Sequence, residues 1–277
     1  MWGVVFAAAA TAVMTPTMVA GQSMRTVTMS RQLSDHDDLR VFVEYGAGHF
    51  KVRSVEEGLL YRMNLRYDEE AFEPVADFSG DRLRLGVESI RRGVNVKGRE
   101  SGELELELAR GVPTDLDLKF GAVQADIDLG GLALTDLDLE TGASKSLVDI
   151  SEPNPERMRS ASFEFGAAEF TVTNLGNLNT EHIEVDAGVG SITLGLGGRW
   201  ERDARLSIDM GLGALELRVP DGLGIRLRKD SFLTTLDSEG LIKRGDVYES
   251  LDFENAERKV EIDLDAAFGS VSVVWIG

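Results

Sequence analysis

The chain has 277 residues, of which 43% are hydrophobic and 28% charged, and its formal net charge is −19. This length and apolar content allow one large or two modest domains with packed cores, and they argue against a disordered chain. The acidic balance argues against nucleic acid and anionic lipid surfaces as partners, because both require clustered lysine and arginine. We interpret the acidity itself as a source of solubility through self-repulsion.

The first residues have the pattern of a secretory signal peptide. An apolar run covers 2–13, Pro16 follows it, and the small residues Ala20 and Gly21 stand where a signal peptidase would cut. We expect a signal peptide over 1–23, although the usual positive charge before the run is missing, and an uncleaved anchor is the alternative. The run is shorter than the ~20 apolar residues of a membrane-spanning helix. We therefore expect no membrane insertion after signal cleavage.

The chain contains no cysteine. This excludes disulfides, thiolate metal sites, thiol nucleophiles and a lipid anchor on cysteine. We expect an exported bacterial protein, whether periplasmic, extracellular or associated with the cell surface, that is held together by packing alone.

Alternation of apolar and polar residues, which is typical of half-buried β-strands, recurs along the chain. The clearest segments are 39–43, 83–87, 104–108, 116–120, 215–219, 225–227 and 260–264. Helical periodicity is nearly absent, and the best helical candidate is a short segment around 154–160, beside Pro153 and Pro155. The sequence therefore predicts an all-β protein.

Glycines mark an internal repeat in the middle of the chain. Successive markers are 21, 24, 22 and 23 residues apart: Gly121, Gly142, Gly166, Gly188 and Gly211. Each lies between two alternating strands, as in "IEVDAGVGSITL" (183–194), and further copies are recognisable at 41–52 and 262–275. A step of about 22 residues predicts a β-solenoid, a β-helix-like stack of strand–turn–strand repeats. We expect the glycines to let the chain turn between faces and neighbouring coils stack closely.

The order of these motifs resembles a known family. "VPTDLDLKFGAVQADIDLGGLALTDLDLETGAS" (112–144) is similar to the β-solenoid of the toast-rack and adhesin-like bacterial families, which include the C-terminal part of cell-wall-active antibiotic response proteins. "VEYGAGHFKVRS" followed by "GLLYRMNLRY", within 43–67, resembles the module that precedes that solenoid. The resemblance implies a β-solenoid and an envelope location, and it supplies no catalytic residues. Two departures are the missing membrane helices and a segment rich in lysine and arginine at 222–256.

From these patterns we expect three parts. They are a signal peptide at 1–23, a toast-rack-like N-terminal β module at 24–110 and an adhesin-like β-solenoid domain at 111–277.

The acids of "LDLETGASKSLVDI" (137–150) suggest a calcium loop at first sight. An EF-hand loop that starts at Asp136 would need glycine at position six and glutamate at position twelve, where Thr141 and Leu147 stand. We therefore reject an EF-hand. A ladder of stacked acids remains, and we favour a solvated acidic face, with weak binding of divalent cations to relieve repulsion as the alternative. The candidates for the ladder are Asp115, Asp117, Asp126, Asp128, Asp136 and Asp138.

No motif points to catalysis. Paired acids for glycoside hydrolysis lack an aromatic context, and the three histidines, His36, His49 and His182, have no partner at ligand spacing. The Gly-x-Gly segments precede strands, so they cannot offer a helix N-terminus to a phosphate. We predict no catalytic, cofactor-binding or metal-binding residues, and no cofactor.

Two basic stretches stand out in this acidic chain. One contains Arg82, Arg84, Arg91, Arg92, Lys97 and Arg99, and the other covers 224–230 with Lys243 and Arg244. Alternation places Arg82 with Arg84, and Arg226 with Arg228, on one strand face. We favour edge strands that charge protects from aggregation. The alternative is a contact face for an acidic envelope component or for another copy of the chain.

The sequence favours a non-enzymatic envelope protein, an interaction, adhesion or stress-response accessory module that binds another protein or a polymer through a solenoid face. One alternative is a polysaccharide-active enzyme with acids in a groove, which a groove combining several acids with exposed aromatics would support. The other is a Ca²⁺-stabilised structural module. A homo-oligomer is also compatible with the sequence.

Overall fold

The computed structural model describes residues 22–34, 38–55, 58–90 and 101–277. Most of the expected signal peptide, His36 and the basic residues from Arg91 to Arg99 lie outside the described residues. Among the described residues, no helix is long and apolar enough to span a membrane.

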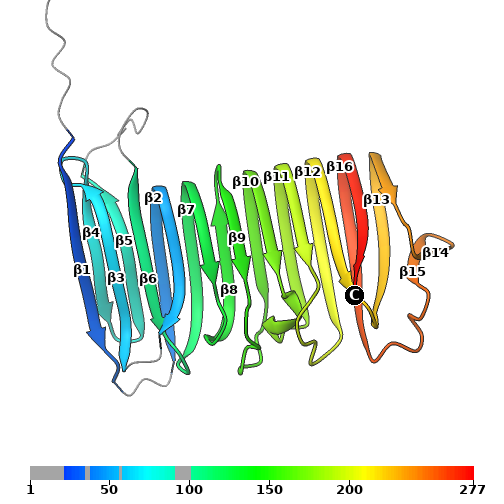
Figure 1. The fold of residues 1–277 in the computed structure, drawn as a ribbon, viewed down its shortest axis with the longest axis horizontal. Helices are drawn as coiled ribbons and strands as arrows, with labels where there is room; N and C mark the ends of the chain where they lie inside the picture. Colours follow the sequence, from blue (N-terminus) through cyan, green and yellow to red (C-terminus); the bar gives the residue numbers. More distant parts are fainter. Residues whose placement is uncertain (1–21, 35–37, 56–57, 91–100) are drawn as a thin grey trace, which may run out of the picture.

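The chain folds as one elongated stack of strands (Figure 1). In chain order the elements are β1 (Met24–Gln32), β2 (Leu39–Val55), β3 (Leu59–Asp68), β4 (Phe72–Ser79), β5 (Arg82–Ser89), β6 (Gly102–Ala109), β7 (Pro113–Asp128), β8 (Ala133–Thr141), β9 (Lys145–Asp149), β10 (Ala161–Thr173), η1 (Leu175–Leu178), β11 (His182–Gly195), β12 (Ala204–Pro220), β13 (Leu223–Asp237), β14 (Leu241–Arg244), β15 (Val247–Ser250) and β16 (Arg258–Ile276). The strands of the described residues form one sheet of 16 strands.

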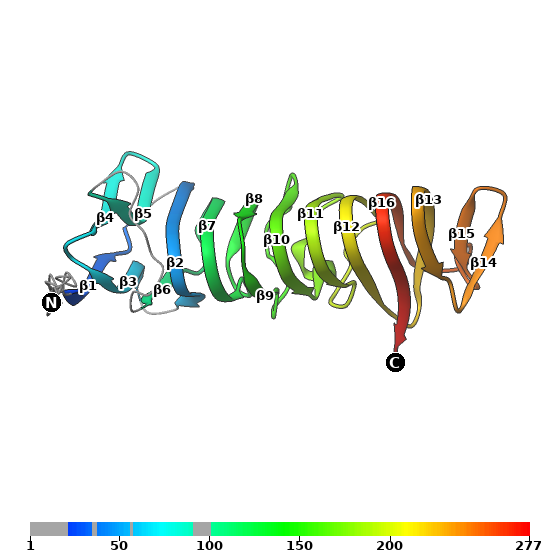
Figure 2. The ribbon, with the colours of Figure 1, turned by 90° about the horizontal axis from the view of Figure 1, so that it is seen from above.

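The middle of the stack is a parallel β-solenoid, as the repeat predicts. Neighbours in the order β2, β7, β8, β10, β11, β12, β16 and β13 pair in parallel. Each of these strands is a long arc, and the arcs stand in single file along the axis of the molecule (Figure 2). Within this file, β8 and β9 are the two halves of one arc: β8 pairs with the first half of β10 and β9 with the second.

Parallel pairing in register stacks equivalent residues of successive coils. One inward position is occupied by Val43, Leu118, Leu139, Phe163, Val185, Ile208 and Leu264, and each of these residues is buried. The alternation in the sequence therefore builds a single continuous core, since every coil covers the apolar side chains of the coil before it.

The marker glycines form a second row, at the point where each arc bends. We call it the glycine row: Gly46, Gly121, Gly142, Gly166, Gly188 and Gly211. A Cβ atom at Gly211 would lie 2.6 Å from the carbonyl oxygen of Gly188 in the coil before it. Glycine is required there because the preceding backbone occupies the space of a side chain. The strand bends at this row and continues, so the expected sharp turn is a corner inside one strand.

Each long strand of the solenoid contributes two sides of a coil, one on either side of the glycine corner. The remaining side consists of loops, and buried asparagines hold these loops together. The Oδ1 of Asn154 accepts a hydrogen bond of 3.0 Å from Leu134 N–H, and its Nδ2 donates to the carbonyls of Leu134 and Leu178 at 2.8 and 3.1 Å. Asn177 repeats the arrangement, donating to Ile150 O at 2.7 Å. These amides satisfy buried backbone groups that no sheet pairs.

The helical candidate around 154–160 is wrong. The segment is irregular, with one isolated bridge between Met158 and Thr180. Asn154 precedes Pro155, which disfavours helical torsions at Asn154, and the side chain of Asn154 supplies the hydrogen bonds that a helix would make internally. The one helical turn in the described part of the chain is η1, a 3-10 turn.

Antiparallel strands cap both ends of the stack. At the N-terminal end β3 pairs with β1 and β6, and β4 pairs with β5. At the other end β15 pairs with β14 and with the first part of β13. Such caps shield the open strand edges of a solenoid. The expected boundary between an N-terminal module and the solenoid at 110/111 stays a prediction, and β2 pairs directly with β7.

The order of strands departs from the order of the chain at the C-terminal end. β16 lies between β12 and β13 and pairs with both in parallel (Figure 1). β13 is therefore separated from the strand that precedes it in the chain, and β16 fills the gap between them.

The glycine row provides a matched test of the packing. Gly211→Ala should lower the free energy of unfolding by about 1–3 kcal/mol, because its Cβ atom would overlap the Gly188 carbonyl. Gly46→Ala should leave stability nearly unchanged, because Gly46 begins the row and a Cβ atom there has nothing within 4 Å. Urea unfolding of both variants measures the difference; equal losses would contradict this account of the corner.

Candidate functional site

The acids expected to form a ladder fall on two different faces. Asp115 lies beside Asp136, and Asp117 beside Asp138, in the register of β7 and β8. Arg159 forms ion pairs with both Asp115 and Asp136. Repulsion in this pair of stacked acids is therefore relieved by an arginine of the chain itself.

Asp126 and Asp128 belong to the second half of β7 and lie apart from the other acids. The Nη2 of Arg53 forms an ion pair of 2.7 Å with Asp126, and Ser151 donates a hydrogen bond of 2.7 Å to Asp128. Within 22–34, 38–55, 58–90 and 101–277, no group of three or more histidine or acid side chains is arranged to hold a metal ion. His49 is exposed on β2, and His182 lies on a distant strand, β11.

The edge-strand interpretation is wrong for the arginine pairs on β5 and β13, whereas Lys243 and Arg244 do lie on an edge strand, β14, at the end of the sheet. β5, which carries Arg82 and Arg84, lies between β2 and β4. The segment Arg226–Arg228 of β13 lies between β16 and β15. These arginines serve neighbouring coils: Arg226 pairs with Glu249 at 2.8 Å and with Glu261 at 3.3 Å. They neutralise acids inside the stack, where we expected charge that protects an edge.

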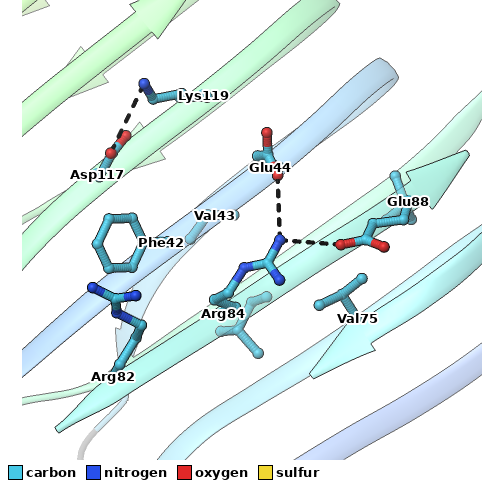
Figure 3. Close-up of a pocket in the computed structure, with 11 residues that line it drawn as sticks. Phe42, Val43, Glu44, Val75, Arg82, Arg84, Glu88, Asp117 and Lys119 are labelled. Atoms are coloured by element: carbon cyan, nitrogen blue, oxygen red, sulfur yellow. Dashed lines mark hydrogen bonds and ion pairs between the residues drawn. The ribbon is translucent and has the colours of Figure 1, made fainter. Parts of the chain in front are cut away.

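A cavity of about 360 Å³ opens where β5 meets β2 and β7 (Figure 3). Arg84 lies between Glu44 and Glu88, at 3.8 and 3.0 Å. The guanidinium of Arg82 lies over the ring of Phe42, 5.1 Å from its centroid. The carboxylates beside Arg84 are thus engaged, and a cation already occupies one face of the aromatic ring.

Asp117 is the unusual residue of this cavity. Its Oδ1 is buried and has no hydrogen-bond partner in the described part of the chain, and Lys119 Nζ is 4.0 Å from its other oxygen. Burial raises the pKa of Asp117; Lys119 opposes this, while Asp138, Glu140 and Asp115 add to it. A carboxylate with these surroundings weakens the fold when it is charged.

A row of acids that we did not predict runs beside the glycine row. We call it the acid row: Glu164, Asp186, Asp209, Asp265 and Asp230, on β10, β11, β12, β16 and β13, in register. With Gly166, Gly188 and Gly211, its first four members line a groove of about 590 Å³. The sequence contained the signal, because an acid stands two residues before the marker glycine in "EFG", "DAG" and "DMG".

One residue beyond the glycine row is a row of exposed apolar side chains. We call it the apolar row: Val189, Leu212, Phe268 and Leu233, in register on β11, β12, β16 and β13 and 52%, 51%, 45% and 62% exposed, respectively. The equivalent positions on β2, β7 and β10 are the small residues Ala47, Ala122 and Ala167. The corner of the solenoid therefore changes from small to bulky apolar residues along the stack.

Comparisons with known proteins concern the whole chain. The family described as "N-terminal domain of toast_rack, DUF2154" matches residues 19–173 and 160–218, more than half of the chain. No curated protein matches.

Three solved structures are similar over most of the chain. A candidate cell adhesion protein from Clostridium sporogenes ATCC 15579 is 13% identical, with 92% of this chain and 100% of that chain covered and a TM-score of 0.47. A candidate adhesin from Bacteroides fragilis NCTC 9343 is 12% identical, with 90% of this chain and 97% of that chain covered and a TM-score of 0.39. A candidate lipid-binding protein from Parabacteroides distasonis ATCC 8503 is 12% identical, with 91% of this chain and 97% of that chain covered and a TM-score of 0.32.

Asp117→Asn should raise the free energy of unfolding at neutral pH by roughly 1 kcal/mol, because it removes a buried charge with an unpaired oxygen. The pKa of Asp117 is raised in the folded protein, so protonation favours the fold as pH falls through that value. The gain should therefore shrink as pH approaches the ordinary value of 3.8. Urea unfolding at neutral pH and near pH 3.8 measures the gain, with Asp252→Asn, at an exposed position far from this cavity, as control; a gain independent of pH would contradict the assignment.

Proposed function

This chain belongs to the family of the toast_rack N-terminal domain, and we propose that it is a non-enzymatic binding module of the cell envelope. It engages another protein or a polymer through one long face of its solenoid. The observation that carries the proposal is the apolar row, four large side chains in register that are each about half exposed.

Exposure of this kind is costly unless a partner covers it. An isolated apolar residue on a surface is ordinary, but a contiguous patch marks an interaction site. Burying half of each of these side chains would stabilise a complex by a few kcal/mol in total, at about 25 cal/mol per Å². A rigid stack holds them in a line, so binding orders little of the chain, which favours affinity.

The grooves with several carboxylates do not favour the enzymatic alternative. In the acid-row groove the aromatic side chain is Phe165, which is 3% exposed. In the groove beside Glu181 and Glu261, Phe253 is 4% exposed and lies under Arg226. A sugar ring stacks on a free aromatic face, and these faces are buried or covered. Export through the segment 1–23 and a location in the envelope are part of this proposal.

The test is binding of the purified protein to envelopes isolated from the source bacterium, followed by co-sedimentation. The wild type should bind saturably. The triple variant Val189→Ser, Leu212→Ser, Leu233→Ser should bind at least tenfold more weakly, with an unchanged melting temperature, since the three side chains are half exposed.

The matched control replaces Ile242, Val274 and Leu251 with serine. These apolar residues are also exposed but lie outside the row, and the control should bind within twofold of the wild type. Unaltered binding of the row variant would disprove the proposal, as would release of soluble sugar from the envelopes by the wild type.

A further inference from the structure

The acid row differs from the other charged rows of the solenoid. The acids of β16 that lie further from the corner, Glu261 and Asp263, are neutralised by arginines of the neighbouring strands. Arg205 and Arg226 each lie 3.3 Å from Glu261, and Arg228 lies 3.2 Å from Asp263. No ion pair among the described residues involves the acid row. Adjacent carboxylates about 4.8 Å apart repel by about 1 kcal/mol even in water. Arg228 is only two residues from Asp230, yet it pairs with Asp263 and not with the acid row.

The acid row and the apolar row run in parallel over the same strands. The two rows are three positions apart along each strand, as Asp209 and Leu212 are, so their Cα atoms lie at most about 10 Å apart. An α-helix with its side chains is about 10–12 Å wide. Its pitch of about 5.4 Å is close to the spacing of about 4.8 Å between coils, so successive turns meet successive strands.

We propose that the partner on this face is a basic amphipathic helix of another protein, lying across β11, β12, β16 and β13. Its cations lie on the acid row and its apolar side chains on the apolar row. Four coils span about 14 Å and the fifth acid extends this to about 19 Å, which corresponds to a helix of about three to four turns. This inference rests on the proposed function and names the chemistry of the partner.

Charge selects this occupant over two others. A second copy of this chain would bring acid against acid, because its net charge is −19 and Arg84, Arg226 and Arg228 are engaged in ion pairs within the chain. An anionic lipid surface or acidic polymer would be repelled by the same row. A basic helix satisfies both rows at once.

The probe is a synthetic 14-residue peptide with lysine on one face and leucine on the other, with its affinity measured by fluorescence anisotropy. Asp186→Asn with Asp209→Asn should weaken binding about tenfold, the loss of two ion pairs at a desolvated surface. Glu70→Gln with Glu73→Gln is the control; it removes the same charge from exposed positions on the N-terminal cap and should bind within twofold of the wild type.

Two further measurements complete the test. The apolar-row triple variant should also weaken peptide binding about tenfold, and a scrambled peptide of the same composition should bind at least tenfold more weakly than the amphipathic one. Absence of peptide binding, equal binding of the scrambled peptide, or equal effects of the acid-row and control variants would overturn the inference. If the triple variant still lost envelope binding in those cases, the proposed function would stand without it.

Discussion

The structure depends on parallel pairing in register between successive coils, which places each residue directly over its equivalent about 4.8 Å away. Every position of the repeat therefore becomes a row that runs the length of the stack. Inward rows can be apolar without restriction, since stacked leucine, valine and phenylalanine simply extend the core. At the corner of β7, β10, β11 and β12 the residue is glycine, because the carbonyl oxygen of the preceding coil occupies the space of a Cβ atom. Outward rows are constrained by charge, because stacking in register places side chains of the same charge on successive coils next to one another, where they repel.

The outward rows meet this constraint in different ways. Where acids stack on β7 and β8, Arg159 reaches across from a neighbouring loop. The acids Glu261 and Asp263 of β16 lie beside arginines of β12 and β13 and form ion pairs with them. The acid row beside the corner has no such arginine and adjoins the bulky apolar row. A surface that combines unpaired acids with exposed apolar side chains is unfavourable in isolation, and this combination distinguishes it from the other outward rows that the structure describes.

The sequence predicts those features that repeat along the chain and misses those that depend on distant partners. Alternation and the spacing of glycines are local properties, so the strands, the solenoid and the role of Gly211 follow from them. The acid row also repeats locally, as an acid two residues before each of Gly166, Gly188 and Gly211, but the denser acids around Asp136 dominate the charge pattern of the sequence. The position of β16, the neutralising role of Arg226 and the irregular path around Asn154 depend on which strands become neighbours. Composition and periodicity contain no information about that choice.

The position of β16 has a consequence for how the solenoid is completed. During synthesis β12 and β13 emerge first, and neither can complete its pairing in the stack until β16 has been made. At roughly 5–20 residues per second, the delay between the start of β13 and the end of β16 is a few seconds. For that time β12 presents an unpaired parallel edge, and Leu212 and Leu233 lie on strands without their common neighbour. The end of the stack that carries the apolar row is therefore also the end that assembles last. It is completed when β16 inserts between β12 and β13, whereas β10, β11 and β12 each add to the exposed edge of the coil before them.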